Sequence, residues 1–513
     1  MTSAGRDRLE VKVTGGVVRG SRRAGTIEWR GIPYAAPPVG TLRFRAPQPV
    51  RAWRGVRDAH EFGRVATQAY IGQFRGTPPS VPSGEDCLTL NVIRPADFNS
   101  SVRLPVMVFI HGGGYSAGSS RDFTGQGESF VRGGQVVYVS FNYRLGALGY
   151  LDFSRYSTLA RPIDANLGLR DQVAVLRWVR ANIRAFGGDP RNVTLFGESA
   201  GGNAVTTLFA VPAARSLFAR GIAQSSPANA VYSREVGAHW ASEFVEILGR
   251  RTLTVPSNDD EIVELLTATP APELVSAALT LQARVPGNEP GTFPLAPIVD
   301  GGFLPRHPVE AFRMGRAHRV PLIIGTNDRE GSVFRGRIDI LPRSPSRIAS
   351  LFERAPETAR AELSTCYPGL PNGRAASDFG GDYAFWYPSV MVADFHSRYA
   401  PVFSYRFDVA PRLLRLVGLD ATHGIEMFAL FDQRDDRFTR AITVLGGRGP
   451  FTEAGNRMRD SWLRFARSGK PDPNWPRYNE QLRRTRIIGE PDRIESDPRG
   501  DRRRAWVAFL PLA

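Results

Sequence analysis

The sequence predicts an α/β protein with a central, mostly parallel sheet that is flanked by helices. Short apolar runs rich in β-branched residues recur along the chain, as expected for strands buried on both faces. A helical pattern lies between two of these runs, and the order strand, helix, strand requires a parallel crossover. The chain has 513 residues, 42% of them hydrophobic, which is enough for one large core. We therefore expect a single domain over residues 5–513.

The strands are predicted from apolar runs that are followed by turn residues. These runs are 104–110 (LPVMVFI), 136–141 (VVYVSF), 193–196 (VTLF), 221–224 (GIAQ) and 320–324 (VPLII). A helix is predicted between the second and third runs, because six apolar residues from Leu169 to Phe186 recur at helical spacing before the sequence GGDP. A later helix is expected over 451–467, which Gly469 and Pro471 follow.

Residues 230–400 have a different pattern. Helical stretches such as ASEFVEILGR and DDEIVELLTA alternate there with loops rich in proline and glycine. We interpret this part as a helical elaboration over the edge of the sheet and not as a separate domain.

The composition argues against a nucleic-acid-binding protein, despite a net charge of +16. Lys12 and Lys470 are the only lysines, and the arginines are spread along the chain apart from one run at 502–504. Such a uniform use of arginine indicates a compositional bias, and net charge by itself is a weak guide to partners. We expect no nucleic-acid partner.

No membrane segment or secretion signal is predicted. No apolar run reaches the length of about 18 residues that a membrane helix needs. The N-terminal sequence MTSAGRDRLEVKV lacks an apolar signal-peptide region. The two cysteines, Cys87 and Cys366, favour a reducing compartment. We therefore expect a cytoplasmic protein.

The pattern G-x-S-x-G, typical of a serine hydrolase nucleophile, occurs twice, around Ser116 and around Ser199. A nucleophile elbow needs a strand before the serine and a helix after it. Ser199 has both, because VTLF precedes it and AGGNAVTTLFAV follows it. Ser116 follows three glycines, and SSRDFTGQGESF at 119–130 predicts no helix. Ser199 is therefore the predicted nucleophile and Ser116 a loop serine.

The sequence HGGGY at 111–115 suits an oxyanion hole. Three consecutive glycines let the bare backbone approach a substrate closely, because no Cβ intervenes. The N–H groups of Gly113 and Gly114, together with that of Ala200, are the predicted donors to the oxyanion. Each such donor typically contributes ~3 kcal/mol to transition-state stabilisation.

A serine hydroxyl needs a base at neutral pH, and His423 is the predicted one. The chain order serine, acid, histidine excludes His60 and His111. His423 lies in GLDATHGIEMFALF, a loop that leads into an amphipathic helix. Activity is expected to fall below about pH 6 to 7, given the ordinary histidine pKa near 6.5. The remaining histidines are less suited to act as the base. We expect His307 and His318 on the surface, and His239 and His396 within helices.

Spacing alone does not identify the acidic residue that would orient His423. The strand VPLII is followed by GTNDREG, which offers Asp328 and Glu330. Asp300, in PIVDGG, is a third candidate, although capping a turn is its ordinary role.

Long motifs in a fixed order resemble the type-B carboxylesterase family of cholinesterases and carboxylesterases, and most of all its bacterial p-nitrobenzyl esterases. The motifs include GIPYAAPPVGTLRFRAPQPVRAW (31–53), EDCLTLNV (85–92), VFIHGGGY (108–115), NYRLGALGYL (142–151), FGGDPRNVTLFGESAGG (186–202), GTNDREGSVF (325–334) and THGIEMFALF (422–431).

The resemblance implies an α/β-hydrolase fold, with helical insertions over an active-site gorge. It implies a triad of Ser199, His423 and Glu330, since the family's N-x-x-E-G segment aligns on residues 327–331. It also implies the oxyanion donors named above and a supporting structural role for Glu198. The implied activity is hydrolysis of small to medium carboxylic esters through an acyl-enzyme, with no metal or organic cofactor.

Two departures from the family bear on function. Thr67 stands where secreted relatives carry a cysteine, so the disulfide to Cys87 cannot form. The loop after Thr67 contains Tyr70, Phe74 and Arg75 but lacks the tryptophan that binds choline in cholinesterases. We therefore expect no dedicated choline-ester site.

Two alternatives remain beside the esterase interpretation. Some cholinesterase-like proteins are non-catalytic adhesion modules, but here all triad positions are present. A carbamate, amide or lactone hydrolase would use the same machinery. The aromatic residues expected either to line the gorge or to pack in the core are Phe293, Phe334, Tyr383, Phe385 and Trp386.

Overall fold

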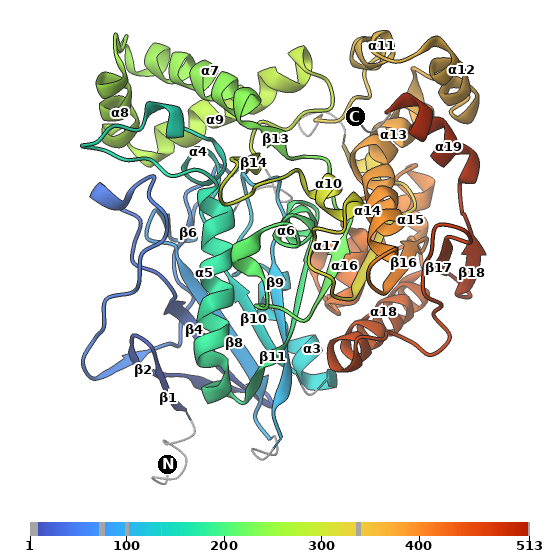
Figure 1. The fold of residues 1–513 in the computed structure, drawn as a ribbon. Coiled ribbons are helices and arrows are strands. Elements are labelled where there is room, and N and C mark those ends of the chain that lie inside the picture. The colour runs from blue at the N-terminus through green and yellow to red at the C-terminus, as the bar shows by residue number, and fades with distance from the viewer. Residues whose placement is uncertain (1–8, 71–76, 98–101, 135, 335–339, 511–513) are drawn as a thin grey trace.

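A sheet of eleven strands runs through the protein (Figure 1). The computed structural model describes residues 9–70, 77–97, 102–134, 136–334 and 340–510. In sheet order the strands are β18 (Arg493–Ser496), β17 (Arg484–Ile488), β16 (Val402–Phe407), β15 (Leu322–Asn327), β12 (Arg220–Gln224), β11 (Gly188–Glu198), β9 (Leu104–Ile110), β10 (Val137–Phe141), β8 (Thr89–Pro95), β4 (Thr26–Pro33) and β3 (Ser21–Arg23). Small sheets join β1 (Glu10–Val13), β2 (Gly16–Arg19) and β5 (Val56–Asp58), β6 (Val65–Ala66) with β7 (Ser83–Gly84), and β13 (Tyr232–Ser233) with β14 (Ile298–Val299).

The centre of the large sheet is parallel, which confirms the predicted class. The parallel pairings run without interruption from β10 through β9, β11, β12, β15 and β16 to β17. All five predicted strands are present, as β9, β10, β11, β12 and β15. The third, β11, is longer than predicted, because it begins at Gly188, inside the segment expected only to end the preceding helix.

Helices cover both faces of the sheet and enclose two hydrophobic cores. Side chains alternate along β9: Val106 and Val108 enter the larger core, and Met107 and Phe109 enter the smaller. The predicted crossover helix is α5 (Leu167–Asn182), followed by a 3₁₀ turn and by Gly187 in the left-handed conformation. The predicted late helix is α18 (Arg448–Ser468), which ends at Gly469.

The segment 230–400 is largely helical, as predicted. It contains α7 (Arg234–Thr252), α8 (Asp259–Ala268), α9 (Ala271–Asn288), α10 (Pro308–Arg313), α11 (Pro345–Glu353), α12 (Glu357–Cys366), α13 (Gly373–Gly381) and α14 (Tyr387–Ser397). Figure 1 shows α7, α8 and α9 across the top of the molecule and α10 to α14 on its right. The remaining helices are α2 (Phe123–Gln126), α3 (Glu128–Gly134), α4 (Ala147–Tyr150), α6 (Ala200–Leu208), α15 (Arg412–Leu416), α16 (Ile425–Leu430), α17 (Arg437–Ile442) and α19 (Gly500–Phe509).

Two local predictions were wrong, and tertiary packing explains both. Residues 119–130 contain α2 and the start of α3, although no helix was expected. Phe130 is fully buried there between Tyr138 and Phe196, and this burial outweighs the low helix propensity of the local glycines. His318 is buried and stacks on Phe218, although it was expected on the surface. His307 is half-buried at the start of α10.

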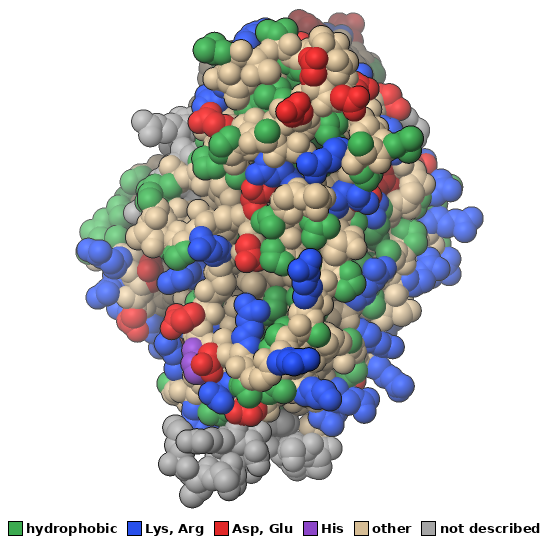
Figure 2. Space-filling view, turned by 90° about the vertical axis from the view of Figure 1, so that its left-hand side faces the viewer, with side chains coloured by type: hydrophobic (Ala, Val, Ile, Leu, Met, Phe, Trp, Pro, Cys, Tyr) green, Lys and Arg blue, Asp and Glu red, His purple; other side chains and the backbone are tan. Residues whose placement is uncertain are grey.

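Figure 2 shows the charged side chains on one face of the molecule. Lys and Arg side chains are scattered there from top to bottom, with acidic and hydrophobic side chains between them. Among the described residues, no single helix combines the length and apolar composition needed to cross a membrane. The bent pair α8 and α9, which meet at 112°, reaches that threshold only when joined.

Candidate active site

Ser199 lies at a sharp turn between β11 and α6. Its backbone has φ 59° and ψ −124°, a region that is unfavourable for residues other than glycine. The turn is held on both sides, because the Ser199 N–H donates to the Gln224 carbonyl at 3.0 Å and the Ser199 carbonyl accepts from the Asn203 N–H at 2.9 Å. A Cβ at Gly201 would lie 2.1 Å from the Ile110 carbonyl oxygen, so the close approach of α6 to β9 requires glycine.

The glycine loop after β9 lies directly against this turn. A Cβ added at Gly112 would come within 3.2 Å of the Ser199 Cβ. Gly113 has φ 107°, and a Cβ there would lie 2.2 Å from the Ala117 carbonyl oxygen. The glycine loop therefore reaches the serine at Gly112, the residue before the two predicted oxyanion donors Gly113 and Gly114. Ala200 is the first residue of α6, so its N–H is among those without a partner inside the helix.

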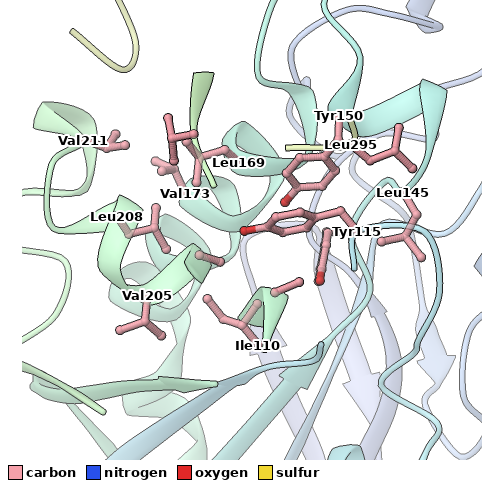
Figure 3. Close-up of a cluster of buried hydrophobic side chains, with 14 of the residues drawn as sticks. Ile110, Tyr115, Leu145, Tyr150, Leu169, Val173, Val205, Leu208, Val211 and Leu295 are labelled. Carbon is pink, nitrogen blue, oxygen red and sulfur yellow. The ribbon is translucent and has the colours of Figure 1, made fainter. Parts of the chain in front are cut away.

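Tyr115 fastens the glycine loop to the helix that follows Ser199. Its ring is buried and stacks on Tyr150 at a centroid distance of 3.9 Å (Figure 3). Its hydroxyl donates to the Asn203 Oδ1 of α6 at 2.6 Å. Sequence reasoning missed both residues, because the pattern HGGGY does not show which helix the tyrosine reaches.

His423 and Glu330 form a close, buried pair. The imidazole Nδ1 lies 2.5 Å from the Glu330 Oε2. The other carboxylate oxygen, Oε1, accepts from the Ser225 hydroxyl and from the Asn327 N–H, both at 2.6 Å. Glu330 follows β15, and His423 precedes α16, so the pair joins two loops that are far apart in the sequence. Ser225 was not predicted, since its nearness to Glu330 depends on β12 and β15 being neighbours in the sheet.

Glu198 contacts the other nitrogen of the same imidazole. The His423 Nε2 lies 3.2 Å from the Glu198 Oε1. Among the residues that the structure describes, the hydrogen bonds of His423 do not include one to the Ser199 hydroxyl. Burial lowers the pKa of His423, but the carboxylates of Glu198 and Glu330 outweigh burial and raise that pKa to about 9. Burial raises the pKa of Glu198 to about 7, although His423 opposes this effect.

A third buried carboxylate, Glu426, lies three residues after His423, in the first turn of α16. Its oxygens accept from the Asn327 side-chain amide at 2.6 Å and from the Gln224 amide at 3.3 Å. Burial, with repulsion from Glu198 and Glu330, raises the pKa of Glu426 to about 8. The sequence analysis missed Glu426, although its position three residues after His423 is a signal that could have identified it.

Aromatic rings form a wall beside His423. The centroid of the Phe385 ring is 4.3 Å from that of the imidazole, and that of Phe334 is 5.2 Å away. Phe293 and Tyr383 pack against the same small apolar cluster. Trp386 belongs instead to the large core. Four of the five aromatic candidates thus gather at or behind the histidine.

The competing candidates are engaged elsewhere. Asp328 forms an ion pair with Arg499 at 2.6 Å, and Asp300 accepts from the N–H groups of Gly302 and Leu304 in a turn. Ser116 lies in a loop, where its hydroxyl donates to the Gly113 carbonyl at 3.3 Å. Both cysteines are free, and Thr67 and Cys87 line the same small cavity. Of the predicted choline-loop residues, Phe74 and Arg75 lie outside the described residues, and Tyr70 is exposed.

Comparisons with known proteins agree on one family. Residues 7–506 match the model of the Carboxylesterase family. The chain is 34% identical to para-nitrobenzyl esterase of Bacillus subtilis, over 95% of this chain and 96% of that one. It is 33% identical to phenmedipham hydrolase of Pseudarthrobacter oxydans, over 93% and 94% of the two chains. Among solved structures, a PNB esterase superposes with a TM-score of 0.85 at 33% identity, over 98% of this chain and 100% of that one.

Proposed function

This chain belongs to the carboxylesterase family and is a serine carboxylic-ester hydrolase, and we propose that Ser199, His423 and Glu330 are its catalytic triad. The observation that carries the proposal is the buried 2.5 Å contact between the His423 Nδ1 and Glu330. A carboxylate at that nitrogen fixes the tautomer in which Nε2 can accept a proton. Ser199 lies on a strained turn and directly follows Glu198 in the chain. The Glu198 carboxylate contacts the same Nε2 of His423.

In the proposed reaction, His423 takes the Ser199 proton as the hydroxyl oxygen attacks the ester carbonyl. The N–H groups of Gly113, Gly114 and Ala200 hold the oxyanion of the tetrahedral intermediate. His423 then protonates the leaving alcohol, which breaks the ester C–O bond and leaves an acyl group on Ser199. Water repeats the sequence, with His423 as base, and releases the carboxylic acid.

The base must be unprotonated to start this cycle. Because Glu198 and Glu330 raise the pKa of His423 to about 9, activity is expected to fall as the pH drops through a range above 6.5. This lies higher than the limit expected from an isolated histidine.

We propose that apolar groups on the substrate pack against Phe385 and Phe334. These rings adjoin His423 and present no charge. Small to medium esters with apolar or aromatic groups fit such a wall, and the name of the para-nitrobenzyl esterase relative agrees with that chemistry. Carbamates, amides and lactones remain a second candidate class, because the same triad and oxyanion donors would cleave them, and a substrate panel should include them.

We further propose that residues 5–513 act as one domain in the cytoplasm, without a nucleic-acid partner. Strands from residue 21 to residue 496 share one sheet, which supports the single domain. The two free cysteines support a reducing compartment.

Hydrolysis of p-nitrophenyl acetate and butyrate tests the triad. His423→Ala is expected to lose at least about a thousandfold in kcat. His318→Gln is the matched control, since it also changes a buried histidine, and should keep its activity. An active His423→Ala variant, or an inactive but folded wild type, would contradict the proposal. An inactive protein that a fluorophosphonate leaves unlabelled would favour a non-catalytic adhesion module.

A further inference from the structure

One side chain outside the proposed triad fixes a peptide group of the glycine loop. The His111 imidazole donates from Nδ1 to the Gly112 carbonyl oxygen at 3.0 Å. This nitrogen carries the proton, because a carbonyl oxygen only accepts. The carbonyl and the N–H of a trans peptide point in opposite directions. The hydrogen bond at the Gly112 oxygen therefore sets the direction of the Gly113 N–H, one of the proposed oxyanion donors.

The two peptide groups of the loop are anchored in different ways. Among the residues that the structure describes, neither Gly113 nor Gly114 donates its N–H to a hydrogen bond, so only the opposite carbonyls orient them. The Gly113 carbonyl accepts two backbone N–H groups of the following turn, both at 3.1 Å. In the described part of the chain, the Gly112 carbonyl accepts only from His111. The direction of the Gly113 N–H thus depends on one imidazole.

The His111 imidazole is itself held firmly. It is buried and stacks on the Tyr143 ring, with centroids 4.4 Å apart and an angle of 19° between the planes. The Tyr143 hydroxyl donates to the His111 carbonyl at 2.7 Å, which fixes the backbone that carries the ring. Gly118 packs against the hydrogen bond, since an added Cβ would lie 2.6 Å from Nδ1 and 2.5 Å from the Gly112 oxygen. Only glycine allows such an approach.

A glutamine from a distant segment holds Gly118 in this place. The Gln68 Oε1 accepts from the Gly118 N–H, and the Gln68 Nε2 donates to the Gly118 carbonyl, both at 2.9 Å. Because both ends of the amide bind the backbone of one residue, the side chain fixes the rotation of Gly118 as well as its position. A series of contacts therefore runs from Gln68 through Gly118 and His111 to the Gly113 N–H.

We propose that His111 and Gln68 are positioning residues of the oxyanion hole, which direct the Gly113 N–H at the ester carbonyl oxygen. This role rests on the proposed function, in which that N–H stabilises the oxyanion. A donor is effective only when it points at the place where negative charge develops. Burial lowers the pKa of His111 to about 4, so the ring is neutral where His423 acts as base. Its effect therefore comes from the hydrogen bond and not from a positive charge.

Two substitutions of His111 separate its hydrogen bond from its packing. Asparagine keeps an N–H donor near the position of Nδ1 and removes the ring, whereas phenylalanine keeps a ring for Tyr143 and removes the donor. With p-nitrophenyl butyrate, His111→Phe should lower kcat by about tenfold or more and change KM by less than about twofold. His111→Asn should recover most of that loss. His396→Phe is the matched control, because His396 is also buried and bonds a backbone carbonyl, at 2.8 Å, and kcat should not change.

A substitution of Gln68 tests the outer end of this series of contacts. In Gln68→Glu the carboxylate keeps an acceptor for the Gly118 N–H and loses the donor to its carbonyl, so kcat should fall by about threefold to tenfold. Gln48→Glu is the matched control. Like Gln68, Gln48 donates from Nε2 to the carbonyl two residues before it, but far from Gly118, and kcat should be unchanged. Equal activity of Gln68→Glu and wild type would overturn the role of Gln68.

An inhibitor that forms an oxyanion provides a readout that a loss of folded protein does not move. When an aryl trifluoromethyl ketone binds, the Ser199 oxygen adds to its carbonyl carbon, His423 takes the hydroxyl proton, and the carbonyl oxygen becomes an oxyanion. Its inhibition constant should rise in His111→Phe by the factor by which kcat/KM falls. The matching secondary alcohol has no carbonyl, and its inhibition constant should stay the same.

The outcomes distinguish this role from the ester reaction itself. A loss in His111→Asn as large as that in His111→Phe, or an unchanged ketone inhibition constant in His111→Phe, would overturn the positioning role while the triad stands. A wild type that hydrolyses no ester would overturn the proposed function, and the positioning role with it.

Discussion

The chain carries the pattern G-x-S-x-G twice, and the two copies have different surroundings. Ser199 in the second copy joins the end of β11 to the start of α6, with φ 59°. Ser116 in the first copy lies in a turn, where its own N–H and that of Ala117 both donate to the Gly113 carbonyl at 3.1 Å. The five-residue pattern only permits a sharp turn. The strand and the helix around it determine whether the serine faces a base.

The residue before each serine shows the same contrast. Tyr115 is buried and ties its loop to Asn203, so it serves the structure. Glu198 reaches the Nε2 of His423, so it affects the charge of the proposed base. In the proposed mechanism the two copies are therefore complementary: the first lies in the loop whose backbone holds the oxyanion, and the second carries the nucleophile.

The largest expected effect comes from removing each hydroxyl in turn. Ser199→Ala should lower kcat by up to about a millionfold, the range seen when a serine nucleophile is deleted. Ser116→Ala should change kcat by less than about twofold, because its hydroxyl contacts only a loop carbonyl. Steady-state hydrolysis of p-nitrophenyl butyrate measures both, and similar losses in the two variants would break the comparison.

Replacing the first glycine of each copy by alanine should give the next largest effect, which is a loss of stability. A Cβ at Gly197 would lie 2.7 Å from the carbonyl oxygens of Ile110 and Gly201, so Gly197→Ala should cost about 3 kcal/mol in the free energy of unfolding. Gly114 has φ 60° and no atom nearer than 3.9 Å to an added Cβ. Gly114→Ala should cost only about 1 kcal/mol, from backbone strain. Urea unfolding compares them, and equal costs would contradict the packing argument.

The pH dependence of kcat/KM tests how Glu198 affects the pKa of His423. A carboxylate 3.2 Å from the imidazole favours the protonated form, so Glu198→Gln should lower the pKa of His423. The free base then persists to lower pH, and the acid limb of kcat/KM should move down by about 1 pH unit or more. Glu426→Gln should produce a smaller downward shift, since Glu426 contributes least among the carboxylates around His423. An unchanged limb in Glu198→Gln would show that Glu198 does not set the charge of the base.

The smallest effect is expected from removing the Tyr115 hydroxyl, which ties the glycine loop to Asn203 of α6. Tyr115→Phe leaves the buried Asn203 Oδ1 without this donor and should cost about 1 to 2 kcal/mol in stability. It should also lower kcat, by less than about tenfold, because the loop carries the proposed oxyanion donors. Tyr150→Phe removes a buried hydroxyl that accepts from Gln172, and serves as control. It should cost similar stability and leave kcat unchanged, and equal kcat losses would contradict the anchoring role.

The sequence predicted those features that depend on local pattern. Apolar runs located β9 and β15, and helical spacing located α5. Neighbouring strands and glycines were enough to select Ser199 and His423, whereas Glu330 was chosen over Asp328 and Asp300 only by the family resemblance. One such local prediction was wrong. Residues 119–130 form helices although their glycines disfavour helix, because the burial of Phe130 stabilises them.

Features that depend on the neighbours of each strand could not be predicted. Ser225 reaches Glu330 because β12 lies next to β15, and this order is set by crossovers far apart in the chain. Phe385 reaches His423 through a π-helical turn, for which the sequence has no periodic signal. The sequence places Glu198 next to the predicted nucleophile, but its contact with the His423 Nε2 depends on how the loop that carries His423 packs against β11.

Covalent labelling tests the central claim, that only the second G-x-S-x-G copy holds a nucleophile. The two serines fall in different tryptic peptides, 104–121 and 192–215, because arginines separate them. After reaction with a fluorophosphonate, mass spectrometry should find the label on Ser199 in peptide 192–215, and labelling should be lost in His423→Ala. A label on Ser116, or equal labelling of Ser199 without His423, would contradict the assignment of the site.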